Sequence, residues 1–166
     1  MKSSRSWLAL LGFGAAVAGA AWFGSRFSPA NPATRDWYRQ LAKPSYNPPN
    51  AAFPIVWPIL YVLMTIAGWR TWRQSRSSGR SLSLSLWGAQ LLANAVWTFL
   101  FFGQHAPKEA LADIVLMEGL IAGYVVVTWK IDRTAAICFI PYASWVGFAT
   151  LLNAEIVRLN ANSLTR

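Results

Sequence analysis

The sequence is poor in charged residues, and above all in acidic ones. Only 13% of the 166 residues are charged, and six Asp and Glu stand against fifteen Lys and Arg. Soluble domains carry about 25% charged residues. With 55% hydrophobic residues, the chain has too little polar sequence to cover a water-facing surface. The shortage of charge therefore excludes an ordinary soluble domain and predicts an integral membrane protein.

Cysteine and histidine are also nearly absent, with Cys138 and His105 the single examples. One cysteine allows no internal disulfide, and we expect Cys138 to be a small core residue. A metal site needs three or four converging ligands, and no cluster in the sequence supplies them. His105 is expected to be an interfacial residue. We therefore expect no metal site, no catalytic residues and no required cofactor.

The net charge of +9 raises the question of nucleic acid binding. A nucleic-acid-binding domain places its basic residues on a folded polar face, whereas here they lie between apolar runs. That distribution favours contact with anionic lipid headgroups. We therefore expect membrane lipid, and no nucleic acid, as a partner. The arginine-dense linker over 70–81 favours an N-terminus on the inner side of the membrane.

Five apolar runs predict an all-α bundle of five transmembrane helices in one domain, 1–166. The helices are expected over about 7–25, 53–72, 82–103, 108–130 and 134–158. Each run is near the roughly 20 residues that a helix needs to cross the hydrocarbon core. Because the bilayer offers backbone groups no partner, helices are the form that such runs adopt. Short links between the later runs predict antiparallel neighbours.

The first apolar run also fits a second interpretation. Lys2 and Arg5 precede it, and Ala18-Gly19-Ala20 resembles the small-residue cleavage site of a secretory signal peptide. Trp22 and Phe23 continue the apolar run beyond that point, so we expect a retained helix.

A long first loop, about 26–52, joins the first two helices. Its segment Trp37–Asn50 holds three prolines and two asparagines, which predicts no regular helix. Its aromatic residues make it too adhesive for a free linker. The segment is therefore either a lid lying over the helix ends or an interfacial segment anchored in the headgroup region.

Aromatic and lone polar side chains recur on three of the helices at spacings that place them on common faces. These residues are Trp57 and Tyr61, Asn94 and Trp97, and Tyr142, Trp145, Ala149 and Asn153. Pro58 is expected to kink its helix and to open space near Trp57. The residues could line a cavity for a planar guest. Alternatively, the aromatics form the membrane-interface belt and the two asparagines bridge helices.

Two acids fall within an apolar run, Asp113 and Glu118. Acids inside a membrane span are costly and by default indicate function. The alternative is protonation in place, or pairing with a neighbouring helix or subunit. The sequence leaves the two interpretations open.

Several motifs, in order along the chain, resemble those of the tryptophan-rich sensory protein / translocator protein family, also called the peripheral benzodiazepine receptor family. They are Trp37-Tyr38-x-x-Leu41-x-Lys43-Pro44, Asn47-Pro48-Pro49-Asn50-x-x-Phe53-Pro54-Ile55-Val56-Trp57, Ile59-Leu60-Tyr61-Val62-Leu63-Met64, Gln90-Leu91-x-x-Asn94-x-x-Trp97-x-x-x-Phe101-Phe102-Gly103 and Pro141-Tyr142-x-x-Trp145-x-x-x-Ala149-x-x-Leu152-Asn153. The resemblance extends over most of the chain and indicates a bacterial member.

The resemblance implies a five-helix bundle, usually a homodimer, whose first loop covers a ligand pocket. It implies a receptor or sensor for tetrapyrroles such as protoporphyrin IX and haem, with sterols such as cholesterol as further ligands of the family. Transport of porphyrin or sterol across the membrane is an alternative, and so is light-dependent degradation of protoporphyrin involving Trp57 and Trp145. Carried over by motif, the ligand-binding residues are Tyr38, Pro48, Trp57, Tyr61, Asn94, Trp97, Trp145, Ala149 and Leu152.

Three features depart from the family pattern. Ala51-Ala52 replaces a common Trp-Val, which predicts a looser lid. Glu118 occupies a position that is apolar or aromatic in the family. Ala154 stands where the sterol-recognition motif of animal members needs an aromatic residue, which makes a sterol a less favoured native ligand.

Overall fold

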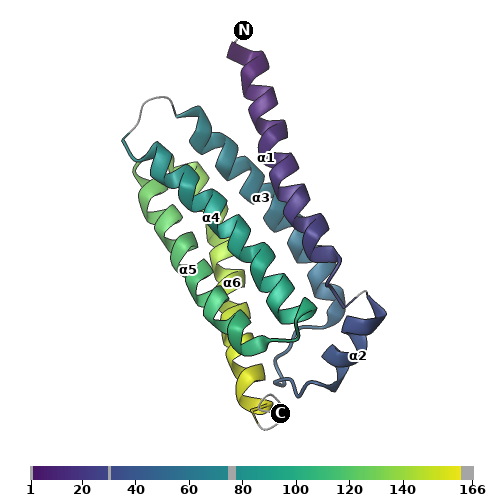
Figure 1. Ribbon diagram of the computed structural model, residues 1–166. Coiled ribbons are helices and arrows are strands. Elements are labelled where there is room, and N and C mark those ends of the chain that lie inside the picture. Colours follow the sequence, from purple (N-terminus) through teal and green to yellow (C-terminus); the bar gives the residue numbers. More distant parts are fainter. Residues whose placement is uncertain (1, 30, 75–77, 162–166) are drawn as a thin grey trace.

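The computed structural model describes residues 2–29, 31–74 and 78–161, and Figure 1 shows these residues folded into a bundle of long helices. The elements are α1 (Lys2–Ser25), α2 (Pro32–Gln40), the 3₁₀ turn η1 (Asn50–Ala52), α3 (Phe53–Arg73), α4 (Arg80–Thr98), the π-helical turn η2 (Phe99–Gly103), α5 (Pro107–Trp129) and α6 (Arg133–Leu159).

Five of these helical stretches are long and apolar enough to cross a membrane. They are Ser4–Ser25, Asn50–Arg73, Arg80–Gly103, Pro107–Trp129 and Arg133–Leu159. Each lies close to an apolar run expected from the sequence. Pro58 lies inside α3, and that helix continues through it to Arg73.

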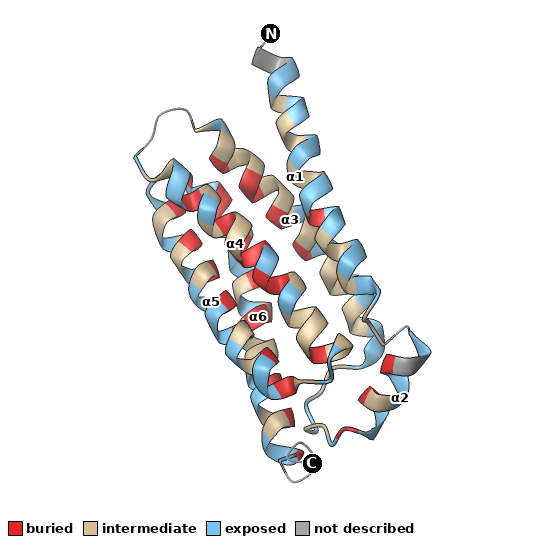
Figure 2. Ribbon diagram, in the orientation of Figure 1, coloured by how far each residue is buried: buried red, intermediate tan, exposed pale blue. Residues whose placement is uncertain are grey.

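Helix α5 packs antiparallel between α4 and α6, and α3 packs antiparallel against α6. Helix α1 lies on the outside against α3 and α4, and most of its length is exposed (Figure 2). Gly68 of α3 allows this packing. A Cβ atom there would lie 2.7 Å from the Phe13 ring and 2.8 Å from the Trp87 ring. The two rings therefore occupy the space that a side chain at position 68 would fill.

Aromatic rings fill the centre of the bundle. Tyr124, Phe139 and Tyr142 are fully buried, and the rings of Tyr124 and Phe139 have centroids 4.1 Å apart. The Tyr124 hydroxyl lies 2.8 Å from the hydroxyl of Thr71 on α3. Buried hydroxyls of this kind need a partner in a membrane interior, so the pair also fixes α3 against α5.

One end of the bundle is rich in arginine, and we call it the basic end. It is where α1, α4 and α6 begin and where α3 and α5 end (Figure 1). Three arginines there lie over tryptophan rings: Arg73 over Trp69 at 4.7 Å, Arg80 over Trp72 at 6.0 Å and Arg133 over Trp129 at 5.9 Å. Tryptophan and arginine together are typical of a membrane–water interface.

Asp132 organises the basic end from the link between α5 and α6. Its carboxylate accepts from the Ala135 amide at 3.0 Å and so caps α6. It also forms an ion pair with Arg70 at 3.1 Å and accepts from Gln74 at 2.8 Å. Burial alone would raise the pKa of Asp132, but these hydrogen bonds and the Arg70 charge hold that pKa below its ordinary value.

The first loop lies at the opposite end of the bundle, beside the end of α6 (Figure 1). The sequence-based expectation of no regular helix from Trp37 onward was wrong, because α2 continues to Gln40. The prolines explain the difference. Pro32 is the first residue of α2, where a missing amide costs nothing. Pro29 precedes the helix, and the remaining prolines of the loop begin after it has ended, at Pro44.

Candidate functional site

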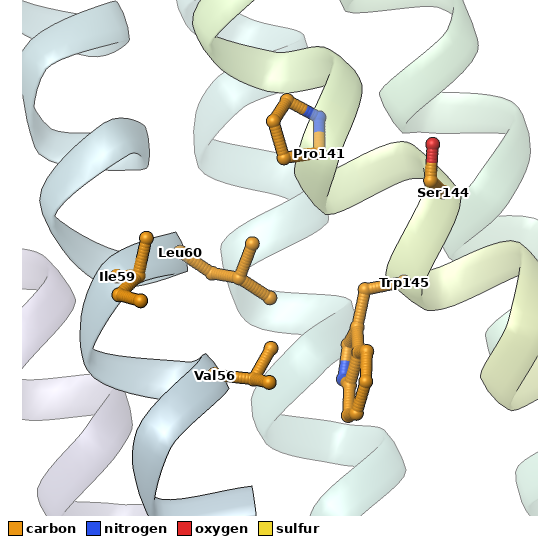
Figure 3. A pocket seen from close by; sticks show the side chains of 6 residues that line it. All are labelled: Val56, Ile59, Leu60, Pro141, Ser144 and Trp145. Atoms are coloured by element: carbon orange, nitrogen blue, oxygen red, sulfur yellow. The ribbon is translucent and has the colours of Figure 1, made fainter. Parts of the chain in front are cut away.

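An apolar cavity of about 340 Å³ lies between α3 and α6. Its lining residues are Val56, Ile59, Leu60, Pro141, Ser144 and Trp145. Figure 3 shows Val56, Leu60 and Trp145 pointing into the space between the two helices. Ile59 is 57% exposed, so the cavity opens sideways toward the lipid-facing surface. An apolar molecule dissolved in the bilayer could therefore reach it without crossing water.

Trp57 extends an aromatic surface from α3 toward the centre of the bundle. Its ring centroid lies 5.2 Å from that of Tyr61 and 6.5 Å from that of Tyr142. The Tyr142 hydroxyl accepts a hydrogen bond from the Asn94 side chain at 3.2 Å. This group therefore combines flat π-faces with an amide and hydroxyls that could orient a planar ligand.

Trp97 connects this region with the first loop. Its indole N–H donates to Asn153 Oδ1 at 3.0 Å, and Asn153 in turn donates to the Pro107 carbonyl at 2.8 Å. The ring of Trp97 stacks on Phe101 and meets Phe102 edge-on. Asn94 and Asn153 thus bridge helices, as one of the two sequence-based interpretations proposed.

The expected ligand-binding residues separate into two groups. Trp57, Tyr61, Asn94, Trp145 and Ala149 lie in or against the main core around Tyr142. Tyr38 and Leu152 are buried in a second cluster under the first loop, with Leu41, Phe101 and Ile156, and Trp97 packs against both clusters. Pro48 is half-buried, and its carbonyl accepts from the Asn47 side chain. Of the nine expected residues, only Trp145 also lines the α3–α6 cavity.

Several contacts fasten the first loop to the bundle. Trp37 of α2 stacks on His105 with ring centroids 4.2 Å apart and an interplanar angle of 8°. His105 holds a left-handed backbone conformation with φ of 54°, which is uncommon outside glycine. The Asn160 side chain exchanges two hydrogen bonds with the backbone of Ala42. Tyr38 packs edge-on against Phe102.

Lys43 strengthens the fold of the loop from within. Its ammonium donates to the carbonyls of Tyr38 and Leu41 and lies 4.5 Å from the Tyr38 ring centroid. Burial lowers the pKa of Lys43, and burial raises the pKa of Tyr38 against the smaller effect of its hydrogen bond from the hydroxyl to Asn47. The first loop is therefore an ordered segment packed over the helix ends rather than a free connection.

Asp113 and Glu118 of α5 each bury a carboxylate oxygen that has no hydrogen-bond partner among the described residues. The other oxygen of Glu118 lies 3.8 Å from the point where a side chain would begin at Gly147 of α6. No group of three His, Cys, Asp or Glu side chains in the described part of the chain could hold a metal ion. The two acids are thus isolated polar groups inside the bundle.

Most of the cavity wall was not predicted from the sequence. Val56, Leu60 and Pro141 are ordinary apolar residues within longer motifs, and nothing in their spacing distinguishes wall from core. A usable signal was Pro141, a proline inside α6 four residues before Trp145, since both residues line the cavity.

Comparison with known proteins identifies the family. The model of the TspO/MBR family matches residues 13–159. The chain belongs to the TspO/MBR family. It is 36% identical to a tryptophan-rich sensory protein of Cereibacter sphaeroides over 159 residues, covering 96% of each chain. It is 36% identical to Protein CrtK of Rhodobacter capsulatus, covering 87% of each, and 31% identical to the human translocator protein, covering 93% of this chain and 91% of that one.

Family membership identifies the five apolar helices as membrane-spanning. This TspO/MBR protein is a multi-pass integral membrane protein, and its helices form the five-helix bundle expected from the sequence. The α3–α6 cavity, the aromatic group around Tyr142 and the packed first loop are therefore features of a membrane-embedded bundle.

Proposed function

We propose that the protein is a membrane receptor for flat apolar molecules of the tetrapyrrole class, such as protoporphyrin IX. The observation that carries the proposal is the α3–α6 cavity, which has Trp145 on one wall and opens toward lipid. Its volume of about 340 Å³ lies within the range of small-molecule sites, roughly 300–1,000 Å³.

The surroundings of the cavity support a planar guest. Trp57 and Tyr61 lie on the same helix as half of the cavity wall, and Phe53 meets Trp145 edge-on with centroids 5.9 Å apart. Aromatic faces bind planar π-systems by offset stacking. Asn94 and Tyr142 are buried in the core and hydrogen-bonded to each other, so a tetrapyrrole's polar atoms would have to open this pair to bond with it.

The test is a titration of the purified full chain in detergent with protoporphyrin IX, followed by tryptophan quenching. Wild type is compared with Trp145→Ala and with Trp7→Ala as a matched control. Trp7 is 63% exposed on α1 and does not line the cavity. We expect saturable quenching in wild type and in Trp7→Ala, and a loss of affinity of roughly tenfold in Trp145→Ala, in line with the loss of one aromatic contact.

Equal and unsaturable quenching in all three proteins would contradict the proposal, because it would mean that the porphyrin dissolves in the micelle. The same proteins decide between receptor and transporter. In sealed vesicles, a receptor binds its ligand without concentration-dependent flux, whereas a transporter carries it into the lumen.

Light-dependent degradation is tested by illuminating the complex. A degrading enzyme would bleach protoporphyrin faster than detergent alone, and Trp57→Phe with Trp145→Phe would remove the excess while binding persisted. Homodimerisation stays a prediction, and the mass of the protein–detergent complex tests it.

A further inference from the structure

A second hollow, larger than the α3–α6 cavity, lies on the opposite side of α3, at the basic end. It has a volume of about 550 Å³, and we call it the α1 groove. Its lining residues are Arg5, Leu8, Ala9, Gly12, Phe13, Ala16, Trp72 and Trp87. None of the expected ligand-binding residues is among them, so this is a separate surface.

The groove has a rigid floor and an open side. The Trp87 ring is buried, donates its N–H to the Met64 carbonyl at 2.9 Å and meets Phe13 edge-on at 4.8 Å. Gly12 has nothing within 4 Å of the position that a Cβ would take. The small residues of α1 thus leave a channel that the protein's own side chains do not fill.

The length of the groove matches one leaflet of a bilayer. From Arg5 to Ala16, α1 rises about 16 Å at 1.5 Å per residue, which is roughly half of the ~30 Å hydrocarbon core. The wall is apolar along this length, and its single charged residue, Arg5, lies at the end that meets the membrane surface. An acyl chain fits such a wall, and a headgroup would lie beside Arg5.

The charges around the mouth of the groove favour an anion. Arg80 donates to the Trp72 carbonyl at 3.0 Å and lies over the Trp72 ring, so its guanidinium is held beside the groove. Asp132 is the single acid in the links at this end, and it is already paired with Arg70. Arg5 has no ion-pair partner among the described residues.

The same charges disfavour a second copy of the chain in the groove. A parallel copy in the same membrane would bring its own basic end to the same depth, and like charges would meet. A phospholipid supplies the opposite charge at the correct depth. We propose that the α1 groove is a binding site for an anionic phospholipid, with an acyl chain along Gly12 and Ala16 and the phosphate between Arg5 and Arg80.

The experiment is native mass spectrometry of the delipidated full chain, offered phosphatidylglycerol or phosphatidylcholine with the same acyl chains. Each basic residue near an anionic headgroup strengthens binding about fivefold. We therefore expect the first lipid to bind at least about fivefold more tightly as phosphatidylglycerol. Arg5→Gln should remove most of this preference. Arg39→Gln, an exposed arginine at the first-loop end, should leave it unchanged.

Two glycine variants test the groove itself. Gly12→Phe places a ring in the channel and should abolish the tight adduct. Gly19→Phe is the matched control, because Gly19 lies on the same helix, has equally open space and does not line the groove. The two variants are compared only if both unfold at the same temperature as wild type, so that a lost adduct does not reflect a damaged fold. If they do not, Gly12→Leu and Gly19→Leu are used in their place.

Three results would overturn the proposal. They are equal binding of the two lipids by wild type, an unchanged preference in Arg5→Gln, and an unchanged adduct in Gly12→Phe. A Gly12→Phe protein that changes from dimer to monomer, with its lipid adducts intact, would instead make the groove an interface between copies.

Discussion

Asn160 and Ala42, separated by 118 positions in the sequence, exchange a pair of hydrogen bonds: the Ala42 amide donates to Asn160 Oδ1 at 3.0 Å, and Asn160 Nδ2 donates to the Ala42 carbonyl at 2.9 Å. The same Nδ2 also donates to the Ile156 carbonyl at 2.8 Å. One side chain therefore completes the end of α6 and holds the first loop against it.

Replacing Asn160 should loosen the first loop. In Asn160→Ala the two loop hydrogen bonds are lost, at a cost of about 1–3 kcal/mol. We expect amide hydrogen exchange over 38–47 to accelerate at least about tenfold and a bound porphyrin to dissociate faster. Arg158→Gln is the control, since it breaks the exposed Arg158–Glu155 pair on the same helix without touching the loop. Unchanged exchange in Asn160→Ala would mean that the stacked Trp37 and His105 hold the loop by themselves.

Stability at low pH should depend on Asp132. The pKa of Asp132 in the folded protein lies below its ordinary value of 3.8, so this group stabilises the fold above that ordinary value. Its contribution is lost as the pH falls through the lower folded pKa. Asp132→Ala should cost about 2–4 kcal/mol at pH 7, since it removes an ion pair and a helix cap.

The measurement for Asp132 is unfolding in mixed micelles between pH 7 and pH 3. Wild type should lose stability toward the low end, and Asp132→Asn should start lower and show a flatter pH dependence. A parallel decline in both proteins would assign the acid sensitivity to other carboxylates.

Gly68 should tolerate no side chain. In Gly68→Ala the new methyl group would meet the rings of Phe13 and Trp87 at under 3 Å, and overpacking of this kind costs about 1–3 kcal/mol. Gly19→Ala should be neutral or slightly stabilising, because Gly19 faces open space and alanine favours the helix by about 1 kcal/mol. Thermal unfolding of the two variants compares them directly, and equal stability would mean that α1 shifts away from α3 at little cost.

Glu118 should lower the stability of the folded protein. One of its carboxylate oxygens is buried without a partner among the described residues. Glu118→Met should therefore raise the free energy of unfolding by about 1–3 kcal/mol, measured by thermal unfolding beside Glu118→Gln. If Glu118→Met is more stable and binds porphyrin normally, the acid has no part in binding. A drop in stability would reveal a partner for the carboxylate.

The helices and the family could be predicted from the sequence because both depend on local pattern. Runs of about 20 apolar residues define each span, and the motifs around Trp57, Asn94 and Trp145 are contiguous or regularly spaced. The helix-bridging roles of Asn94 and Asn153 were also within reach, since a buried amide in a membrane needs a partner.

The cavity and the loop contacts depend on where helices meet, which spacing does not determine. Leu60 and Leu91 are both buried in the core, yet only Leu60 of the two also lines the cavity, and the packing of α3 on α6 distinguishes them. The stacking of Trp37 on His105 joins two segments 68 positions apart. The helical residues Trp37–Gln40 were missed because the prolines that were counted against a helix begin only at Pro44, after α2 has ended.

Trp97 packs against both the main core and the cluster under the first loop, and this arrangement has a thermodynamic consequence. Any ligand that shifts the Trp97 ring changes the free energy of both clusters at once. Coupling between two binding equilibria is reciprocal. If a ligand changes the affinity of a second molecule for the first loop, that molecule must change the affinity of the ligand by the same factor. Through the Trp97 indole, ligand binding in the main core and clamping of the first loop would therefore be coupled.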